Sequence, residues 1–326
     1  MSSIKKTWLL AALVLLAQPW FGASWSQEKY PNKPVRIVVS VGPGSSADLL
    51  ARFLADYLRR DLQTEFVIDN KTGAGGVLAG DFVAKSKPDG YTLALFNASV
   101  VTTVTVVNSN VSYDPIRDFT PIATLVTNPL TLIVNAGSKW NTLEQLLDDA
   151  RKAPGKLACG IIGVGSHTHF NLELLKIASN ADINRIPYTA GTGPIISALL
   201  GGHIACASLA WAAVESLVKG GKFRGLAVTS TIKDYPQIPT FASKGFPQAS
   251  LEVFFALFGP ARLPQDVMDR LLPAVDRIMT RQEDLAKIEK MGFSILYEAP
   301  GQLAERLRRE VALVREVART AGIKEE

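Results

Sequence analysis

Residues 35–58 read VRIVVSVGPGSSADLLARFLADYL, and three local patterns follow one another in this stretch. Val35 to Val41 is an almost continuous β-branched run, which is typical of a strand buried on both faces of a parallel sheet. A loop rich in glycine and serine follows, and from Leu49 to Leu58 the apolar residues recur at helical spacing. The stretch therefore predicts a strand, a loop and a helix of an α/β protein.

The same alternation continues along the chain. Strands are predicted over residues 65–69, 91–96, 130–134, 156–162, 184–187, 203–209 and 223–229, and helices over residues 77–86, 142–152, 169–177 and 195–200. The strand-like run 253–260 leads into two amphipathic helices. One sheet does not need this many strands, so we expect two doubly wound α/β domains joined by a hinge.

The order of the patterns also predicts where the chain passes between the domains. It is expected to cross near Ile122 to Leu132 and to return near Phe246 to Phe254. Lobe 1 then comprises residues 27–127 and 249–326, and lobe 2 comprises residues 128–248. A cleft between such lobes is lined by loops at the carboxyl ends of strands, where α/β proteins bind ligands.

Composition excludes several classes of protein. Of the 326 residues, 47% are hydrophobic and 20% are charged, which is far from the composition of disordered chains. The net charge of +5 comes from 35 basic and 30 acidic residues without a Lys/Arg run, which argues against nucleic-acid binding. Three His and two Cys are too few for a zinc-ribbon or cluster protein.

The first 26 residues predict a cleavable secretory signal peptide. Lys5 and Lys6 precede a ten-residue apolar stretch, Trp8 to Ala17, which is too short for the ~20 residues of a membrane-spanning helix. Ser24 and Ser26 suit cleavage before Gln27, and no Cys lies there to carry a lipid anchor. We therefore expect a soluble mature protein exported to a bacterial periplasm.

Export leaves two interpretations of the cysteines open. Cys159 and Cys206 both lie in predicted strands, and an oxidising compartment permits a disulfide if those strands are neighbours. Alternatively, both are small buried hydrophobic residues.

Three glycine-rich loops are the strongest candidates for ligand binding. The first, Gly42–Asp48, opens a helix whose unpaired N–H groups and dipole favour an anion, with serine hydroxyls as further donors. Alternatively, Ser45 or Ser46 only caps this helix and Asp48 complements its dipole. The second loop is Gly73–Gly76, where glycines permit close approach of a ligand to the backbone, and the third is Gly163–His169.

Catalytic signatures are missing from these loops. Residues 163–167 read GVGSH, so the G-x-S-x-G nucleophile elbow is not present, and neither glycine loop fits G-x-G-x-x-G. His167 and His169 have a single further His in the sequence, His203, and no acid beside them, so they predict a donor or structural role and no metal site.

Taken in order, these motifs resemble the solute receptors of tripartite tricarboxylate transporters, often called Bug receptors. The similarity runs along the whole mature chain, through residues 30–39, 48–52, 70–76, 88–93, 113–115, 118–122, 165–169, 187–188, 199–202 and 226–230. The resemblance implies a two-lobed, hinge-closing periplasmic-binding-protein fold, type II-like. It also implies a monomer without cofactor or catalytic activity that delivers a small carboxylate to a membrane permease. Receptors of this kind cradle the carboxylate with backbone and hydroxyl groups and with ordered water.

The resemblance, together with the loops, gives one set of candidate ligand-binding residues: Gly42, Pro43, Gly44, Ser45, Ser46, Asp48, Gly73, Ala74, Gly75, Gly76, Asn97, Ser99, Gly165, Ser166, His167, Thr168, His169 and Tyr188.

Some positions depart from the family pattern. Gly44-Ser45 replaces paired glycines, Tyr188-Thr189-Ala190 replaces Tyr-Lys-Gly, and Ala205 stands where an acid is common. These changes predict a ligand less charged than citrate: a monocarboxylate, an aromatic acid or an amide. Trp211, Phe254 and Phe255 either line such a pocket or pack in the core.

Two other functions compete with transport. A protein of the same fold can sense a ligand and signal to a membrane sensor, and the sequence does not distinguish these partners. A secreted α/β hydrolase is disfavoured because the nucleophile elbow is missing.

Overall fold

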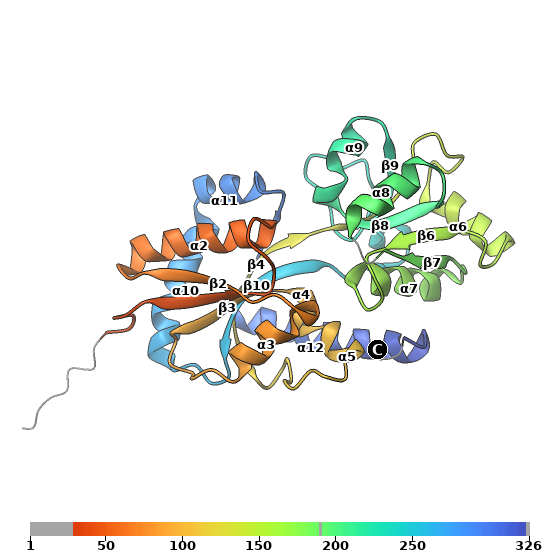
Figure 1. Ribbon diagram of the computed structural model, residues 1–326. Coiled ribbons are helices and arrows are strands. Elements are labelled where there is room, and N and C mark those ends of the chain that lie inside the picture. The colour runs from red at the N-terminus through yellow and green to blue at the C-terminus, as the bar shows by residue number, and fades with distance from the viewer. Residues whose placement is uncertain (1–28, 189–190, 324–326) are drawn as a thin grey trace, which may run out of the picture.

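The computed structural model describes residues 29–188 and 191–323. The predicted signal peptide, 1–26, and the substituted positions Thr189 and Ala190 lie outside the described residues. Two mixed β-sheets with helices on their faces form the described part of the chain (Figure 1). The prediction of two α/β units is confirmed, although antiparallel strands join the parallel ones in both sheets.

The first sheet has six strands in the order β11-β4-β10-β3-β1-β2. Its strands are β1 (Val35–Val39), β2 (Phe66–Asn70), β3 (Thr92–Asn97), β4 (Phe119–Asn128), β10 (Val253–Pro260) and β11 (Ser294–Glu298). β1 lies parallel to β2 and β3, as its β-branched run predicts. β10 returns from far along the sequence and pairs antiparallel with both β3 and β4.

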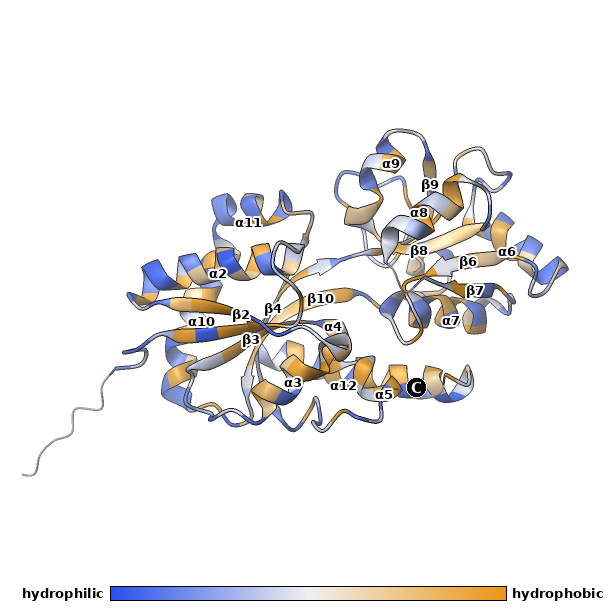
Figure 2. Cartoon of the chain, viewed as in Figure 1, coloured by the Kyte–Doolittle hydropathy of each residue, from blue (hydrophilic) through white to orange (hydrophobic). Residues whose placement is uncertain are grey.

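Helices cover both faces of this sheet, which explains why four of the five residues of β1 are apolar and buried; the fifth, Arg36, is exposed and pairs with Asp69. Ile37 and Val39 pack in the core under α2 (Ser46–Leu62) and α10 (Gln265–Thr280). Val38 points to the opposite face, against α3 (Val77–Ala84). Apolar strands therefore lie between more polar outer helices (Figure 2).

The second sheet has five strands in the order β7-β6-β8-β5-β9. Its strands are β5 (Leu130–Asn135), β6 (Ala158–Ile161), β7 (Asn184–Pro187), β8 (Cys206–Ala210) and β9 (Phe223–Val228). α6 (Leu143–Lys152) and α7 (His167–Ser179) pack in the core on one face, and α8 (Thr192–Leu200) packs on the other. The short α9 (Glu215–Lys219) precedes β9.

Both predicted cysteine strands are neighbours. Cys159 of β6 lies opposite Cys206 of β8, and both side chains are fully buried and free. Burial raises the pKa of the Cys159 thiol, which keeps it protonated. In the structure the two residues therefore act as small buried hydrophobic side chains.

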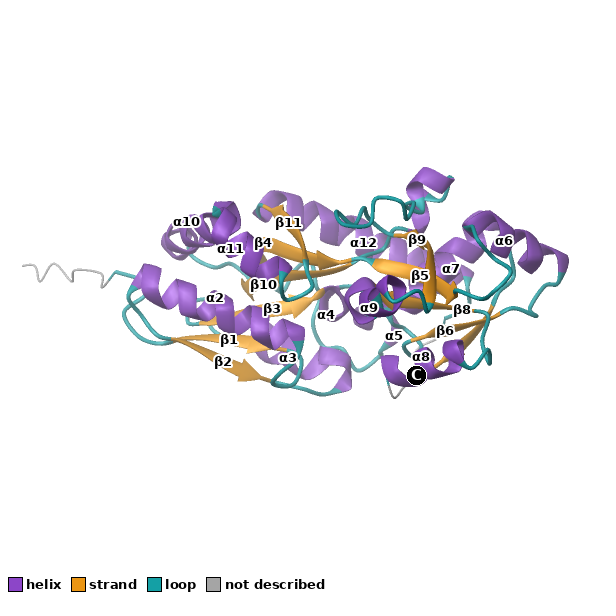
Figure 3. Ribbon diagram, turned by 90° about the horizontal axis from the view of Figure 1, so that it is seen from above, coloured by secondary structure: helices purple, strands orange, loops and turns teal. Residues whose placement is uncertain are grey.

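The chain passes from the first sheet to the second between Asn128 and Leu130 and returns between Val228 and Val253. Figure 3 shows β4 leading into β5 along the first of these crossings. The long helix α12 (Pro300–Thr320) also connects the two cores (Figure 1). Leu303 packs with the first sheet, whereas Val317 packs in the core of the second. The boundaries of the two lobes, residues 27–127 and 249–326 for lobe 1 and 128–248 for lobe 2, remain a prediction from the sequence.

Several elements differ from the sequence-based expectation. β4 and β11 are strands that the apolar pattern did not predict, and three helices follow β10 where two were expected, namely α10, α11 (Gln282–Glu289) and α12. The β-branched run after β3 forms two helical turns, α4 (Ala98–Val101) and α5 (Val104–Val107). In the described residues, no helix is both long and apolar enough to cross a membrane.

Candidate functional site

A pocket of about 380 Å³ lies where loops from the two sheets meet. It is lined by Ser40, Val41, Gly73, Gly75, Gly76, Asn97, Ser99, Thr103, Val104, Val107, Val164, Gly165 and Ser166. Its walls follow the carboxyl ends of β1, β2 and β3 in one sheet and of β6 in the other. This is the edge at which α/β sheets bind ligands, so we take this pocket as the candidate site.

A larger hollow of about 640 Å³ lies beside the end of α7. Its cationic residues are paired with acidic partners: Lys176 and Arg185 contact Glu173, and Arg151 contacts Asp148. Because these cations are already paired, the hollow does not present a group of free charges to a ligand.

Glycines allow the walls of the candidate site to approach one another. At Gly165, whose φ is +78°, a Cβ atom would lie 2.5 Å from Cγ2 of Val107. At Gly76, with φ of +100°, a Cβ atom would lie 2.6 Å from Cγ2 of Val100. Both positions therefore require glycine for conformation and for space.

Ser166 begins α7 at the edge of the pocket. Its Oγ accepts a hydrogen bond from His169 N at 3.2 Å and donates to Gly163 O at 3.0 Å. Oγ also lies 2.8 Å from Oγ1 of Thr168, which in turn accepts from Ile162 N. Ser166 is thus both a helix cap and a wall of the pocket.

His167 connects α7 to α4, the helical turn after β3. Its Nδ1 lies 3.1 Å from Ser99 Oγ and its Nε2 lies 3.4 Å from Thr102 Oγ1. Thr102 already donates to Ala98 O, so its oxygen accepts from His167 Nε2–H and Ser99 donates to Nδ1. Burial lowers the pKa of His167 to about 4, which keeps the ring neutral.

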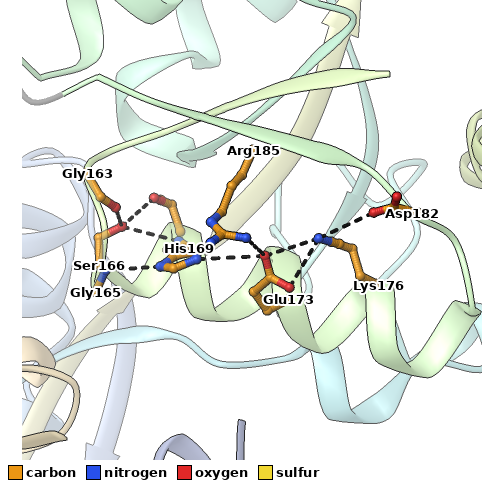
Figure 4. A network of polar contacts seen from close by, with 9 residues as sticks. Gly163, Gly165, Ser166, His169, Glu173, Lys176, Asp182 and Arg185 are labelled. Carbon is orange, nitrogen blue, oxygen red and sulfur yellow. Dashed lines mark hydrogen bonds and ion pairs between the residues drawn. The ribbon is translucent and has the colours of Figure 1, made fainter. Parts of the chain in front are cut away.

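His169 binds the backbone of the glycine loop at Gly165. Its Nδ1 accepts from Gly165 N at 3.0 Å, and its Nε2 lies 3.7 Å from Oε1 of the buried Glu173 (Figure 4). Glu173 is in turn held by Arg185 at 3.1 Å and Lys176 at 3.3 Å. Burial, aided by these two cations, lowers the pKa of His169 to about 4. The network fixes the loop that carries Ser166.

The first glycine loop has a structural role in this geometry. Ser45 Oγ accepts from Asp48 N at 3.2 Å and caps α2. Asp48 is buried, accepts from Gly44 N at 3.0 Å and pairs with Arg52, whose hydrogen bond lowers the pKa of Asp48 to about 2. Of the two interpretations of this loop, helix capping agrees with the structure: Ser45 caps α2, and Asp48 is the acid in its first turn.

The structure brings only some of the predicted residues to the pocket. Gly73, Gly75, Gly76, Asn97, Ser99, Gly165 and Ser166 line it. The remaining predicted residues do not line it: Gly42, Pro43, Gly44, Ser45, Ser46, Asp48, Ala74, His167, Thr168, His169 and Tyr188.

The aromatic candidates also lie elsewhere. Phe254 and Phe255 are buried in the two cores that flank the first sheet. Trp211 is buried and packs edge-to-face against Tyr235, with ring centroids 4.6 Å apart. The three aromatic rings therefore pack in the core and do not line the pocket.

Sequence reasoning missed six pocket residues: Ser40, Val41, Thr103, Val104, Val107 and Val164. Val41 directly precedes the first predicted glycine loop and Val164 lies within the third, so the motifs already pointed to both positions. Thr103, Val104 and Val107 lie in a β-branched run that carries no binding motif. Their position depends on the helical turns that this run forms.

Within residues 29–188 and 191–323, no cluster of three or more His, Cys, Asp or Glu side chains could hold a metal ion.

Two mixed α/β sheets with this topology are the architecture of two-lobed periplasmic binding proteins. The model of the tripartite tricarboxylate transporter family receptor matches residues 50–322, and the chain belongs to this family. The resemblance inferred from the motifs is therefore confirmed.

Relatives and solved structures agree with this assignment. The chain is 30% identical over 318 residues to the protein BugT of Bordetella pertussis, covering 95% of this chain and 97% of that one. A solute-binding protein from Polaromonas has a TM-score of 0.80 at 26% identity, covering 90% of this chain and all of that chain. A Rhodopseudomonas palustris protein with adipate has a TM-score of 0.76 at 29% identity, covering 91% and 100%. MatC from the same organism, with bound malate, has a TM-score of 0.71 at 25% identity, covering 88% and 99%.

Proposed function

We propose that this chain is a periplasmic receptor that captures a small carboxylate in the pocket between the two sheets. It delivers the ligand unchanged to the membrane permease of a tripartite transporter. Membership of the receptor family supports the binding role, and the adipate and malate complexes of similar proteins support a carboxylate. In this proposal the mature chain is an exported monomer and needs no cofactor.

The observation that carries the proposal is the chemistry of the pocket wall. Ser99, Ser166 and Ser40 bring hydroxyl groups, and Asn97 brings an amide. Because Asn97 Oδ1 accepts from Ser99 N, its Nδ2 is the atom that can donate to a ligand. Because Ser99 Oγ donates to His167 Nδ1 and Ser166 Oγ donates to Gly163 O, Asn97 Nδ2 and Ser40 Oγ are the donors to a carboxylate. Hydrogen bonds to the charged group contribute ~1.5–3 kcal/mol each.

A binding screen tests the proposal. Mature protein, shown by mass spectrometry to be free of ligand, is titrated with monocarboxylates and dicarboxylates of two to six carbons. A true ligand at 100 times its Kd should raise the unfolding free energy by about 2.7 kcal/mol and be recovered unchanged. If no acid in the panel binds, or if the bound acid is converted, the proposal is wrong.

Delivery to a permease is tested in cells. Removing the receptor gene should abolish uptake of the acid that binds, and restoring the receptor should recover it. Uptake that does not depend on the receptor would favour a sensing role.

A further inference from the structure

The candidate pocket has apolar lining residues that a carboxylate does not explain. Four of its lining residues are valines, Val41, Val104, Val107 and Val164. Val164 is 44% exposed although it lies in the loop that carries Gly165 and Ser166. An apolar side chain on the wall of a binding pocket contributes affinity when a ligand covers it.

Helix α5 lies between the two cores and carries two of these valines, Val104 and Val107. None of the residues of α5 is fully buried. Val104 packs against the core of the first sheet, whereas Val107 packs against the core of the second and meets the Gly165 backbone. Three of the four valines therefore come from α5 and the loop after β6, and hydroxyl groups lie next to them in the chain: Thr103 precedes Val104, and Ser166 follows Val164 by two residues.

Charged side chains are missing from the described lining of the pocket. None of the thirteen described residues that line it is Lys, Arg, Asp or Glu. The cations on the elements beside it are already engaged: Arg52 pairs with Asp48 at 2.8 Å, and Lys71 lies 3.4 Å from Asp69 and 4.2 Å from the Phe82 ring centroid. A second carboxylate placed against the valines would lose its hydration without gaining a cationic partner.

We propose that this pocket selects an aliphatic monocarboxylate, with the carboxylate at the hydroxyl and amide groups and the hydrocarbon body against Val104, Val107 and Val164. The inference rests on the proposed receptor function and narrows its ligand. It sets this chain apart from the similar proteins whose structures contain the diacids adipate and malate.

The test compares ligands that differ in one feature. Kd is measured by calorimetry for acetate, propionate, butyrate and valerate, and for succinate, in which a carboxylate replaces the methyl group of butyrate. Affinity should rise with each methylene, by up to about 4-fold for full burial. Succinate should bind at least about 10-fold more weakly than butyrate.

A matched pair of variants locates the hydrocarbon. Val164→Thr keeps the side-chain shape but replaces one methyl group with a hydroxyl, so it should weaken valerate binding about 3- to 10-fold and acetate binding much less. Val67→Thr is the control, because Val67 is 53% exposed on β2 and does not line the pocket. It should leave both affinities unchanged.

The outcomes separate this inference from the receptor function. If succinate or adipate binds more tightly than butyrate, or if affinity does not depend on chain length, the monocarboxylate inference is wrong and the receptor function stands. Equal effects of Val164→Thr on acetate and valerate would also overturn it. If neither monocarboxylates nor dicarboxylates bind to ligand-free protein, the receptor function itself fails.

Discussion

At the scale of single residues, Ser166 and Ser45 are matched helix caps with different surroundings. Each Oγ accepts from the N–H three residues later at 3.2 Å, but only Ser166 lines the pocket. Ser166→Ala and Ser45→Ala should each lower the unfolding free energy by about 1 kcal/mol. Only Ser166→Ala should also weaken carboxylate binding, by roughly 10- to 150-fold if the Ser166 hydroxyl turns from Gly163 O to the charged ligand on binding.

Denaturant unfolding and calorimetry on the two variants check this prediction. An unchanged Kd for Ser166→Ala would make Ser166 a cap alone and would remove it from the site.

His167 is expected to make the folding stability of the protein depend on acidic pH. Its folded-state pKa of about 4 is below the unfolded value of 6.5, so the unfolded chain binds the proton first as pH falls. The unfolding free energy that the neutral ring contributes is present above pH 6.5 and is lost as the pH falls toward 4. The total loss is about 3 kcal/mol. His169 shifts in the same direction.

His167→Gln should therefore show a smaller loss of unfolding free energy between pH 7.5 and pH 4.5 than the wild type. Urea titrations at both pH values measure this difference. The exposed His203→Gln is the control and should keep the wild-type slope. Parallel pH profiles for His167→Gln and the wild type would show that His167 does not cause the acid sensitivity.

At the scale of elements, the contact between α5 and the loop after β6 depends on Gly165. Both Gly163 and Gly165 have positive φ, but a Cβ at Gly163 would meet no atom within 4 Å, whereas one at Gly165 would collide with Val107. Gly163→Ala should cost about 1–2 kcal/mol of backbone strain and keep binding. Gly165→Ala should cost more and displace the loop, which weakens binding.

The double variant Gly165→Ala/Val107→Ala provides the decisive comparison, because removing the valine makes room for the new methyl group. It should recover part of the stability that Gly165→Ala loses, as measured by denaturant unfolding. No recovery would mean that backbone strain, and not the contact with α5, explains the glycine.

Helix α12 carries a buried acid at its centre. Burial raises the pKa of Glu310 to about 7, although Arg306 lies 2.9 Å away and opposes the shift. Because the folded pKa is above the unfolded value, stability is full below pH 4.5 and falls as pH rises toward 7. Glu310→Gln should remove this fall, so its stability relative to the wild type should grow by about 3 kcal/mol between pH 4.5 and pH 8.

Thermal and denaturant unfolding at both pH values test the assignment. The exposed Glu305→Gln, on the same helix, should show no such growth. A constant difference between Glu310→Gln and the wild type would contradict a raised pKa at this position.

At the scale of the whole molecule, the chain crosses twice between the sheets, which predicts hinge closure around a ligand. α12 limits how this motion can occur, because Leu303 packs in one core and Val317 in the other. We expect the radius of gyration from X-ray scattering to fall when saturating butyrate is added to ligand-free protein. Equal radii at full occupancy, confirmed by calorimetry, would show that binding needs no closure.

The local units of this protein can be read from its amino-acid sequence. The β-branched run from Val35 and the apolar spacing after Leu49 define a strand and a helix because each pattern is set by neighbours along the chain. The serine caps and the glycine loops follow from the same local chemistry. Their order along the chain was also specific enough to predict the receptor family.

How these units combine, and which residues line the pocket, depends on contacts between elements that are distant in the sequence. β10 lies between β3 and β4 through pairing across more than a hundred residues, and no local pattern encodes that register. The β-branched run that includes Val104 and Val107 forms helical turns because contacts with both cores override its strand propensity. Those contacts place two valines on the pocket wall, while Ser45 and Asp48 are committed to α2. Local spacing fixes the elements, but the walls of a binding site are made by residues that meet only when distant elements pack.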